Sequence, residues 1–327
     1  MSELRRDILD CIGGTSLVPL RTVVPWSGAR ILLKLESENP TGSMKDRMAL
    51  AMIEAAEADG RLAAGGSVVE YTTGNTGMAL SLVCAVKGHP LYIVTSDAFA
   101  REKLDHMGIL GATLRVLRSD GGGQTEKLTR EMIEAARALT EETGAYWTDQ
   151  LNNTDQMAGY RTMADEIWAQ TDGRIDAFVQ SVGSAGCIRG VADGLRRRDQ
   201  RIQIVAVEPA ESAVLSGAPS GAHKIDGMGA GFVVPLWRDG IADRIERVST
   251  EDAVAMSLRL AREEGLFGGP STGANVVAAL RSAERLGPGA TVVTVMCDTG
   301  MKYLSTYGAS LSRRDAARGA DRATARG

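Results

Sequence analysis

The sequence has little of what marks several large protein classes. Its 37 Lys and Arg residues are outnumbered by 41 Asp and Glu, so a net charge of −4 leaves no basic field for nucleic acid. No apolar run approaches the roughly 20 residues that a membrane-spanning helix needs. The start, Met1 to Asp7, lacks the apolar stretch of a signal peptide. We therefore expect a cytoplasmic protein that binds neither nucleic acid nor membrane.

Cysteine and histidine are also few. The four cysteines are scattered without metal-ligand spacing, and three of them lie in apolar or glycine-rich segments. We expect reduced and mostly buried thiols. The three histidines are equally scattered, so the sequence predicts neither a metal site nor a Ser-His-Asp triad.

What is present is an alternation of strands and helices. Short apolar runs predict strands at 31–35, 67–71, 91–95, 113–117, 177–182, 202–207 and 291–296. Longer segments between them have helical spacing; one is 250–264, where Ser249 and Asp252 predict a capping box. Val- and Ile-rich strands separated by helices are typical of parallel sheets covered on both faces. The runs 66–150 and 175–297 suggest two α/β lobes, and the Ala- and Arg-rich tail, 312–327, is expected to be disordered.

The first segment with chemical promise is Asn39 to Arg47, with the sequence N-P-T-G-S-M-K-D-R. A turn sequence leads into an amphipathic helix, and Lys45 stands at the helix start. The helix dipole favours anions there and tends to lower the pKa of a lysine amine. Such an amine can form a Schiff base with pyridoxal phosphate, which then serves as an electron sink. Taken alone, the segment is better explained by a solvated surface lysine.

Two further segments join a strand to a helix through small residues. Tyr71 to Gly77, Y-T-T-G-N-T-G, offers N–H groups and hydroxyls to a carboxylate, and Asn75 could bond a phenolic oxygen of the cofactor. Val182 to Cys187, V-G-S-A-G-C, predicts an anion cup for a phosphate. In isolation, each segment is equally consistent with a simple strand-to-helix turn.

A fourth segment, G-G-P-S-T-G-A at 268–274, also precedes a helix. The neutral hydroxyl of Ser271 could accept a hydrogen bond from a pyridine nitrogen or donate one to it. An aspartate would keep that nitrogen protonated, whereas a serine need not. The alternative is a small-residue N-cap turn.

Together these segments resemble the cysteine synthase (O-acetylserine sulfhydrylase) and cystathionine β-synthase family, which has fold type II of the pyridoxal-phosphate enzymes. The similarity runs from Ile12 to Thr306, about nine-tenths of the chain. Its motifs are N-P-x-x-S-x-K-D-R around Lys45, T-x-G-N-T-G at 72–77, G-x-G-A-G-F at 227–232 and E-E-G-L at 263–266.

The resemblance implies a role for each site residue. Lys45 would carry the cofactor and shuttle the α-proton of the substrate, Asn75 would bond the phenolic oxygen, and Ser271 would face the pyridine nitrogen. The cofactor phosphate would be held by Gly183, Ser184, Ala185, Gly186 and Cys187. The substrate carboxylate would be held by Thr72, Thr73, Gly74, Thr76 and Gln150.

The resemblance also implies an α/β fold of two lobes, each a mostly parallel twisted sheet flanked by helices, with the cofactor cleft between them, as in the tryptophan synthase β-like fold. Residues 43–150 would form a smaller, mobile lobe, in which Phe99 to Arg101 would belong to the part that closes over substrate. Residues 1–42 and 151–311 would form the larger lobe. A homodimer is implied, and we expect a bare catalytic core without haem-binding or regulatory extensions.

Three departures from the family pattern bear on the chemistry. Cys187 stands where the phosphate loop usually has threonine, and a thiol is a poor hydrogen-bond donor. The usual I-G-N-T-P is I-G-G-T-S at 12–16, and M-S-x-E-R-R is A-F-A-R-E-K at 98–103. The last two changes sit where the leaving group and the nucleophile would be handled.

The implied reaction is β-replacement on an O-activated L-serine, O-acetylserine or O-phosphoserine, through an α-aminoacrylate. Sulfide would give L-cysteine; thiosulfate, homocysteine, an amine or a nitrogen heterocycle are alternative nucleophiles. A serine or threonine dehydratase is a further alternative, although such enzymes usually carry S-x-G-N-H where this chain has Thr76 after Asn75. Against a non-enzymatic relative, both Lys45 and Asn75 are present.

Overall fold

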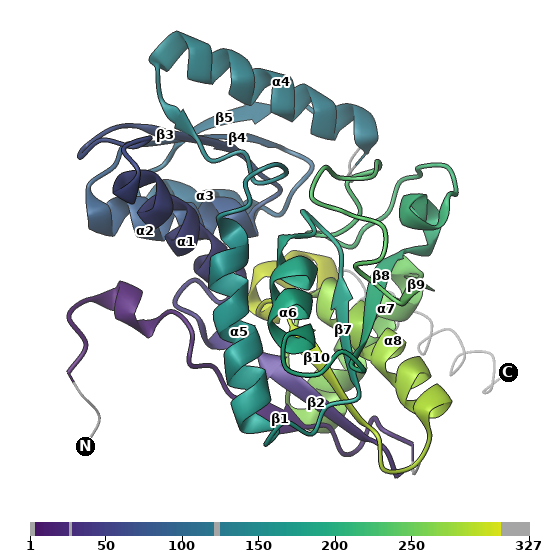
Figure 1. Cartoon of the computed structure of the whole chain (residues 1–327). Coiled ribbons are helices and arrows are strands. Elements are labelled where there is room, and N and C mark those ends of the chain that lie inside the picture. The colour runs from purple at the N-terminus through teal and green to yellow at the C-terminus, as the bar shows by residue number, and fades with distance from the viewer. Residues whose placement is uncertain (1–3, 26–27, 121–124, 309–327) are drawn as a thin grey trace, which may run out of the picture.

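The larger of two sheets has six strands. The computed structural model describes residues 4–25, 28–120 and 125–308. The strands of this sheet are β1 (Leu17–Pro19), β2 (Arg30–Leu35), β7 (Ala177–Ser181), β8 (Gln203–Pro209), β9 (Arg244–Val248) and β10 (Thr291–Met296). Their order is β1-β2-β10-β7-β8-β9 (Figure 1). Only β1 is antiparallel to its neighbour; in the parallel part, Val292 of β10 pairs with both Ile31 and Ala177.

The smaller sheet has four strands, all parallel. They are β3 (Val68–Tyr71), β4 (Leu91–Ser96), β5 (Thr113–Leu117) and β6 (Tyr146–Trp147). The order is β5-β4-β3-β6, and Val68 pairs with Leu91 on one side and Tyr146 on the other. Every residue of β3 is buried, as expected for a central strand whose two faces are both covered.

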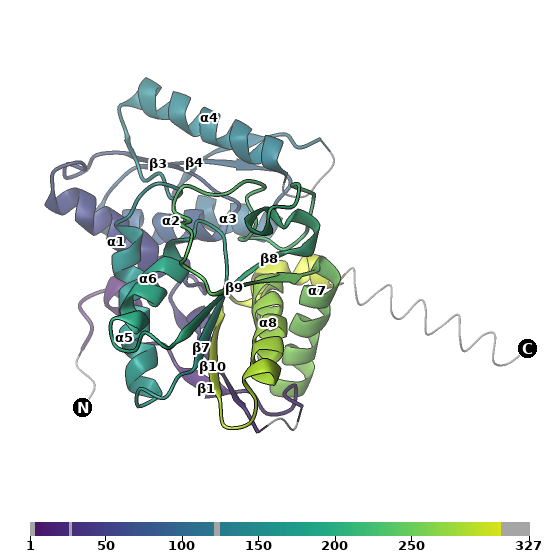
Figure 2. The same cartoon turned by 45° about the vertical axis from the view of Figure 1, so that its right-hand side comes forward.

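Helices cover both faces of both sheets. Over the smaller sheet, α4 (Glu126–Thr143) lies on one face, and α1 (Lys45–Ala58), α2 (Asn75–Lys87) and α3 (Arg101–Ile109) lie on the other (Figure 1). The larger sheet is flanked by α5 (Gln156–Gln170) and α6 (Gly186–Arg196) on one side and by α7 (Thr250–Arg259) and α8 (Pro270–Leu286) on the other (Figure 2). This arrangement confirms the predicted α/β architecture with helix-covered parallel sheets.

One hydrophobic cluster joins the two sheets. It includes Val69 of β3, Met48 of α1, Tyr160 of α5 and Phe178 of β7, all buried. α1 packs against both α2 and α5. The start of α1, and with it Lys45, is therefore fixed between the two sheets.

The seven predicted strands are confirmed to within two residues at each end. The strands β1, β6 and β9 were not predicted, because β1 and β6 are very short and β9 is a charged, partly exposed edge strand. The predicted helix 250–264 changes at Leu260 into a π-helical turn that ends at Glu264. Its cap is as predicted, since the Ser249 hydroxyl accepts from the Asp252 N–H.

The lobe boundaries at residues 43 and 150 remain a prediction. All four strands of the smaller sheet fall between residues 68 and 147. The tail 312–327 lies outside the described residues. In the described ranges no helix is both long and apolar enough to cross a bilayer, and Cys84, Cys187 and Cys297 are buried, free thiols, as expected.

Candidate active site

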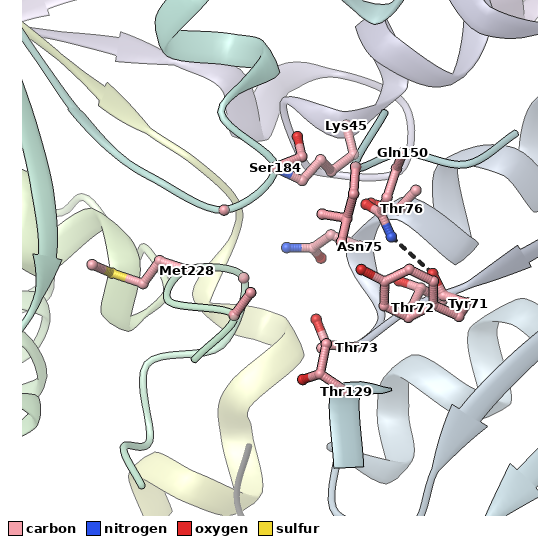
Figure 3. Close-up of a pocket in the computed structure, with 14 residues that line it drawn as sticks. Lys45, Tyr71, Thr72, Thr73, Asn75, Thr76, Thr129, Gln150, Ser184 and Met228 are labelled. Atoms are coloured by element: carbon pink, nitrogen blue, oxygen red, sulfur yellow. Dashed lines mark hydrogen bonds between the residues drawn. The ribbon is translucent and has the colours of Figure 1, made fainter. Parts of the chain in front are cut away.

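A pocket lies where strands of both sheets end, which is the usual ligand position in α/β folds (Figure 3). Eight of the predicted site residues line it: Lys45, Thr72, Thr73, Asn75, Thr76, Gln150, Gly183 and Ser184. Lys45 and Ser184 lie at one end, Thr73 and Thr129 at the other, and Met228 on the facing wall (Figure 3). Thr129 and Met228 were not predicted. The structure thus brings together residues that are far apart in the sequence.

Lys45 is the first residue of α1, and its side chain is only 9% exposed. The Met44 N–H donates to the Cys297 carbonyl over 2.9 Å, which ties the helix start to the end of β10. Within the described ranges, the Lys45 amine has no carboxylate at ion-pair distance. Burial lowers its pKa. The lowered pKa was predicted, but the helix dipole was named as its cause, whereas removal from water is the larger one.

The turn before Lys45 is closed by Asp46. The Asp46 carboxylate accepts from the Thr41 N–H over 2.7 Å and also from the Thr41 hydroxyl. Burial raises the pKa of Asp46 to about 6. These contacts fold Asn39–Gly42 back onto the first turn of α1 and hold Lys45 in place.

The loop between β3 and α2 is organised by Thr72. Its hydroxyl oxygen accepts from the N–H groups of Gly74 and Gly77, over 2.9 and 3.3 Å, and keeps its own proton free to donate. Gly74 has φ +144°, and a Cβ there would lie 2.3 Å from Cδ of Lys103, so only glycine fits. Thr73 is half-buried and lines the pocket. Among the predicted carboxylate ligands, Thr72 and Thr73 therefore have hydroxyl protons available for a ligand.

Gln150 supports this loop from behind. Its Oε1 accepts from the Thr76 hydroxyl over 2.9 Å, and its Nε2 donates to the Tyr71 carbonyl over 2.8 Å (Figure 3). Its backbone N–H donates to Glu70, and burial raises the pKa of Glu70 to about 7. Gln150 and Thr76 thus satisfy each other, so we infer that they shape the carboxylate site more than they bind the ligand.

The segment after β7 forms a cup at the start of α6. Ala185 adopts φ +67°, and the Ser184 hydroxyl donates to Gln156 of α5 over 2.8 Å. A Cβ at Gly183 would lie 2.5 Å from the Gly227 carbonyl oxygen, and one at Gly186 2.0 Å from Gln156 Oε1. The first N–H groups of a helix lack intrahelical acceptors. In the described part of the chain, those of Cys187 and Ile188 have no acceptor.

Five predicted ligands do not line the pocket: Gly74, Ala185, Gly186, Cys187 and Ser271. Among them, Cys187 and Ser271 are the two whose side chains could contact the cofactor. Both are buried, neither lines the pocket, and the described residues offer no hydrogen-bond partner to the Cys187 thiol or the Ser271 hydroxyl. Burial raises the pKa of Cys187, so the thiol stays neutral. Next to Ser271, the Thr272 hydroxyl accepts from the N–H of Cys297 over 3.2 Å. Cys297 also holds Met44, which places Ser271 near the start of α1.

Asn75 is held by residues that the prediction did not include. Its Nδ2 donates to Asp298 over 2.7 Å, and its Oδ1 accepts from the Lys302 amine over 2.9 Å. Tyr303 donates to the same Asp298 oxygen over 2.7 Å. Burial lowers the pKa of Lys302 to about 8. One Asn75 N–H remains for a ligand.

A partly buried ion pair lies in the same region. The Lys103 amine lies 2.8 Å from Asp226 and 4.2 Å from the centre of the Tyr303 ring, and the Lys103 side chain is 1% exposed. Lys103 also packs under Gly74. The sequence pointed to Lys103 only as the last residue of A-F-A-R-E-K, a segment that differs from the family pattern. Its partner, Asp226, lies more than a hundred residues away in the sequence and could not be predicted.

The pocket fits a phosphate-bearing carbonyl cofactor. An amine of lowered pKa faces it, and a cup closed by Gly183 and Gly186 presents free helix N–H groups at the same end. Asn75 offers a further donor beside them. This combination supplies a nucleophile for a carbonyl and a seat for a phosphate.

The family model described as pyridoxal-phosphate dependent enzyme matches residues 8–298. The chain belongs to this family. It therefore uses pyridoxal 5'-phosphate, as the resemblance implied. This pyridoxal-phosphate enzyme is 40% identical over 302 residues to the cysteine synthase of Staphylococcus aureus, covering 92% of this chain and 96% of the relative.

Solved structures agree with the fold. The crystal structure of a cysteine synthase from Entamoeba histolytica matches with a TM-score of 0.86 and 36% identity, covering 93% of this chain and 90% of that one. An O-ureido-L-serine synthase structure matches with a TM-score of 0.85 and 35% identity, covering 93% of this chain and 94% of that one. The fold type II architecture of this pyridoxal-phosphate enzyme is confirmed.

Proposed function

We propose that the chain is a cysteine synthase, which exchanges the O-linked group of an activated L-serine for sulfide. The observation that carries the proposal is the buried Lys45 amine, which has no carboxylate partner and faces a pocket between two helix N-termini. The 40% identity to a protein named cysteine synthase, over nearly the full length of both chains, supports the same activity.

The carboxylate of the substrate would bind at the start of α2. Thr72 and Thr73 offer hydroxyl protons there, and the loop adds backbone N–H groups. Thr76 and Gln150 hold the loop in shape. Because no arginine lines this pocket in the described ranges, neutral donors and the helix dipole would carry the interaction.

Lys45, Asn75, Ser184 and the N–H groups at the start of α6 would hold the cofactor, with Ser271 and Cys187 behind them. When bound, pyridoxal phosphate supplies an electron sink for negative charge at the α-carbon of the substrate. Burial favours the neutral form of the Lys45 amine. In that form it serves as the base that removes the α-proton and later returns it.

The lining of the pocket favours O-acetylserine over O-phosphoserine. Lys45 is the one cationic side chain among the described residues that line it, and it is assigned to the cofactor and the proton. A phosphate dianion on the substrate would lose its hydration without a guanidinium or second amine to replace it. An acetyl ester carries no such cost.

An alternative nucleophile remains the second candidate. A solved neighbour of comparable identity is named for O-ureido-L-serine synthesis, and the segment 98–103 reads A-F-A-R-E-K where the resemblance implies M-S-x-E-R-R. Enzymes of this fold are thus named for different products, and the nucleophile has to be measured.

A homodimer is also proposed, from the resemblance alone, and a cytoplasmic location, from the free and mostly buried thiols. Light scattering at micromolar concentration should give about twice the 34.6 kDa mass of one chain. A mass of one chain would contradict the dimer without touching the activity.

The test is product analysis on the purified holoenzyme. O-Acetyl-L-serine and O-phospho-L-serine are each combined with sulfide, thiosulfate or homocysteine, or with no nucleophile, and products are identified by mass. The proposal predicts L-cysteine from O-acetyl-L-serine and sulfide as the fastest reaction, with Lys45→Ala as the inactive control. Faster turnover with another nucleophile would replace sulfide, and pyruvate released from unmodified L-serine at a comparable rate would indicate a dehydratase.

A further inference from the structure

A second depression lies against α5 and α6, and it shares no lining residue with the active-site pocket. The two helices pack side by side (Figure 1). Its volume is about 570 Å³, within the usual range for small-molecule sites. Five arginines line it, against two aspartates, Asp193 and Asp239. This local excess of positive charge stands on a chain whose net charge is −4.

Arg196 and Arg197 both make hydrogen bonds to the protein, but of the two only Arg196 has a carboxylate partner among the described residues. Arg196 donates to the carbonyls of Gly240 and Ile241, over 3.1 and 2.9 Å, and pairs with Asp243 at 2.8 Å. Arg197 donates to the Asp193 carbonyl over 3.0 Å. The guanidinium of Arg196 therefore has a structural role, whereas exposed Arg197 uses only its Nε in the described structure.

The other three arginines, Arg161, Arg189 and Arg238, have no carboxylate at ion-pair distance among the described residues. Arg189 is 8% exposed, and the one hydrogen bond seen for it there runs from Nη1 to the Leu236 carbonyl over 3.1 Å. Nε of Arg161 is buried without a partner in the described structure. Burial, followed by the charges of Arg238 and Arg161, lowers the pKa of Arg189. Arg161 is half-buried and Arg238 is exposed, so the cost of an unpaired buried charge falls on Arg189, and a bound anion would recover it.

We propose that this pocket binds a nucleoside polyphosphate. A planar guanidinium matches phosphate oxygens in two-point contacts, so three unpaired arginines suit a chain of phosphoryl groups. The volume exceeds what phosphate alone would fill, and the carboxylates of Asp193 and Asp239 are acceptors for ribose hydroxyls or a base amino group. Arg189 lies two residues after Cys187 on the helix that forms the cofactor cup.

The test uses holoenzyme saturated with pyridoxal phosphate, so that the phosphate cup is already filled. Isothermal titration calorimetry with adenosine triphosphate should show saturable binding at one site per chain, tighter than that of adenosine monophosphate. Because a hydrogen bond to a charged group commonly accounts for a factor of ten or more in affinity, Arg238→Gln and Arg161→Gln should each weaken binding about tenfold or more.

The matched control is Arg174→Gln, which removes one positive charge from an exposed arginine paired with Asp172. It should leave the affinity unchanged, and all three variants should keep the turnover and melting temperature of the parent, since none is placed in the active site. The proposal is overturned if adenosine triphosphate does not saturate, if the monophosphate binds equally well, or if Arg174→Gln weakens binding as much as Arg238→Gln. None of these outcomes bears on the proposed cysteine synthase activity.

Discussion

The two helix starts that face the active-site pocket are built alike but anchored differently. The cup before α6 is held from its own side, because Ser184 donates to Gln156 of the neighbouring α5. The loop before α2 is held from across the pocket, because Asn75 contacts Asp298 and Lys302, which follow β10 of the larger sheet. The phosphate site is therefore fixed by helices of the larger sheet alone. The carboxylate site depends on contacts between the two sheets.

This difference separates the two binding events. A phosphate can enter the cup before α6 without breaking any contact between the sheets. Asn75 ties the start of α2 to Asp298 and Lys302, and Lys103 beneath Gly74 connects the same loop to Asp226. A substrate carboxylate that moves this loop therefore disturbs contacts between the two sheets. We expect the cofactor site to stay rigid, while substrate binding shifts the smaller sheet relative to the larger one and closes the pocket to water.

Breaking the ion pair between Lys103 and Asp226 should have the largest effect on the fold. Asp226→Asn leaves the Lys103 ammonium buried without its partner, which commonly costs about 3–5 kcal/mol. Denaturant unfolding should report the loss, and hydrogen exchange should rise across residues 68–110 but not across 183–196. The control is Asp120→Asn, whose exposed partner is Lys127. An equal rise in hydrogen exchange in both regions would mean that the Lys103–Asp226 pair does not join the two sheets.

Glu70, which accepts from the Gln150 N–H behind the α2 loop, should make the stability of the fold depend on pH. Burial raises the pKa of Glu70 from 4.5 to about 7, so the folded state binds this proton more tightly than the unfolded state. The resulting stability is fully present below pH 4.5 and is lost as the pH rises through 7, by up to about 3 kcal/mol. Glu70→Gln should flatten the fall in unfolding free energy between pH 5 and 7. An unchanged slope would contradict the assignment.

Gly74→Ala tests the close packing of the carboxylate loop. The new Cβ would meet Lys103 at 2.3 Å, so the loop must move. The KM for O-acetylserine should rise about tenfold or more, while the affinity for pyridoxal phosphate stays unchanged. Gly144→Ala is the matched control, because Gly144 also has positive φ but has no atom within 4 Å of its Cβ position. A parallel loss of cofactor affinity would show that the two sites are not separate.

The smallest effect is expected in the cup before α6. Cys187→Thr replaces a poor donor by a hydroxyl in the first turn of that helix, so pyridoxal phosphate should bind severalfold more tightly. Equilibrium dialysis measures the affinity, with Cys84→Thr, in α2, as the control. Unchanged or weaker binding would mean that the side chain points away from the phosphate.

The parts of the molecule that follow local rules were predictable from the sequence. The buried strand β3 was predicted from its Val-rich run, and the loops of Thr72 and Ser184 from their small residues between strand and helix. The edge strand β9 was missed because Arg244, Glu246 and Arg247 break its apolar pattern. Charged residues such as Lys103 and Lys302 are expected at the surface. Their burial is set by partners that only the tertiary fold brings near, and no local pattern contains that information.

We expect Lys45, and neither Lys103 nor Lys302, to carry the cofactor. Borohydride reduction of the holoenzyme fixes pyridoxal phosphate to the amine that holds it, and peptide mass mapping then locates the label. Lys302 and Lys103 are internal controls, because both are buried and lie beside the α2 loop. The label is expected on Lys45 alone. A label on Lys302 or Lys103 would contradict the assignment of the site and of the base that moves the α-proton.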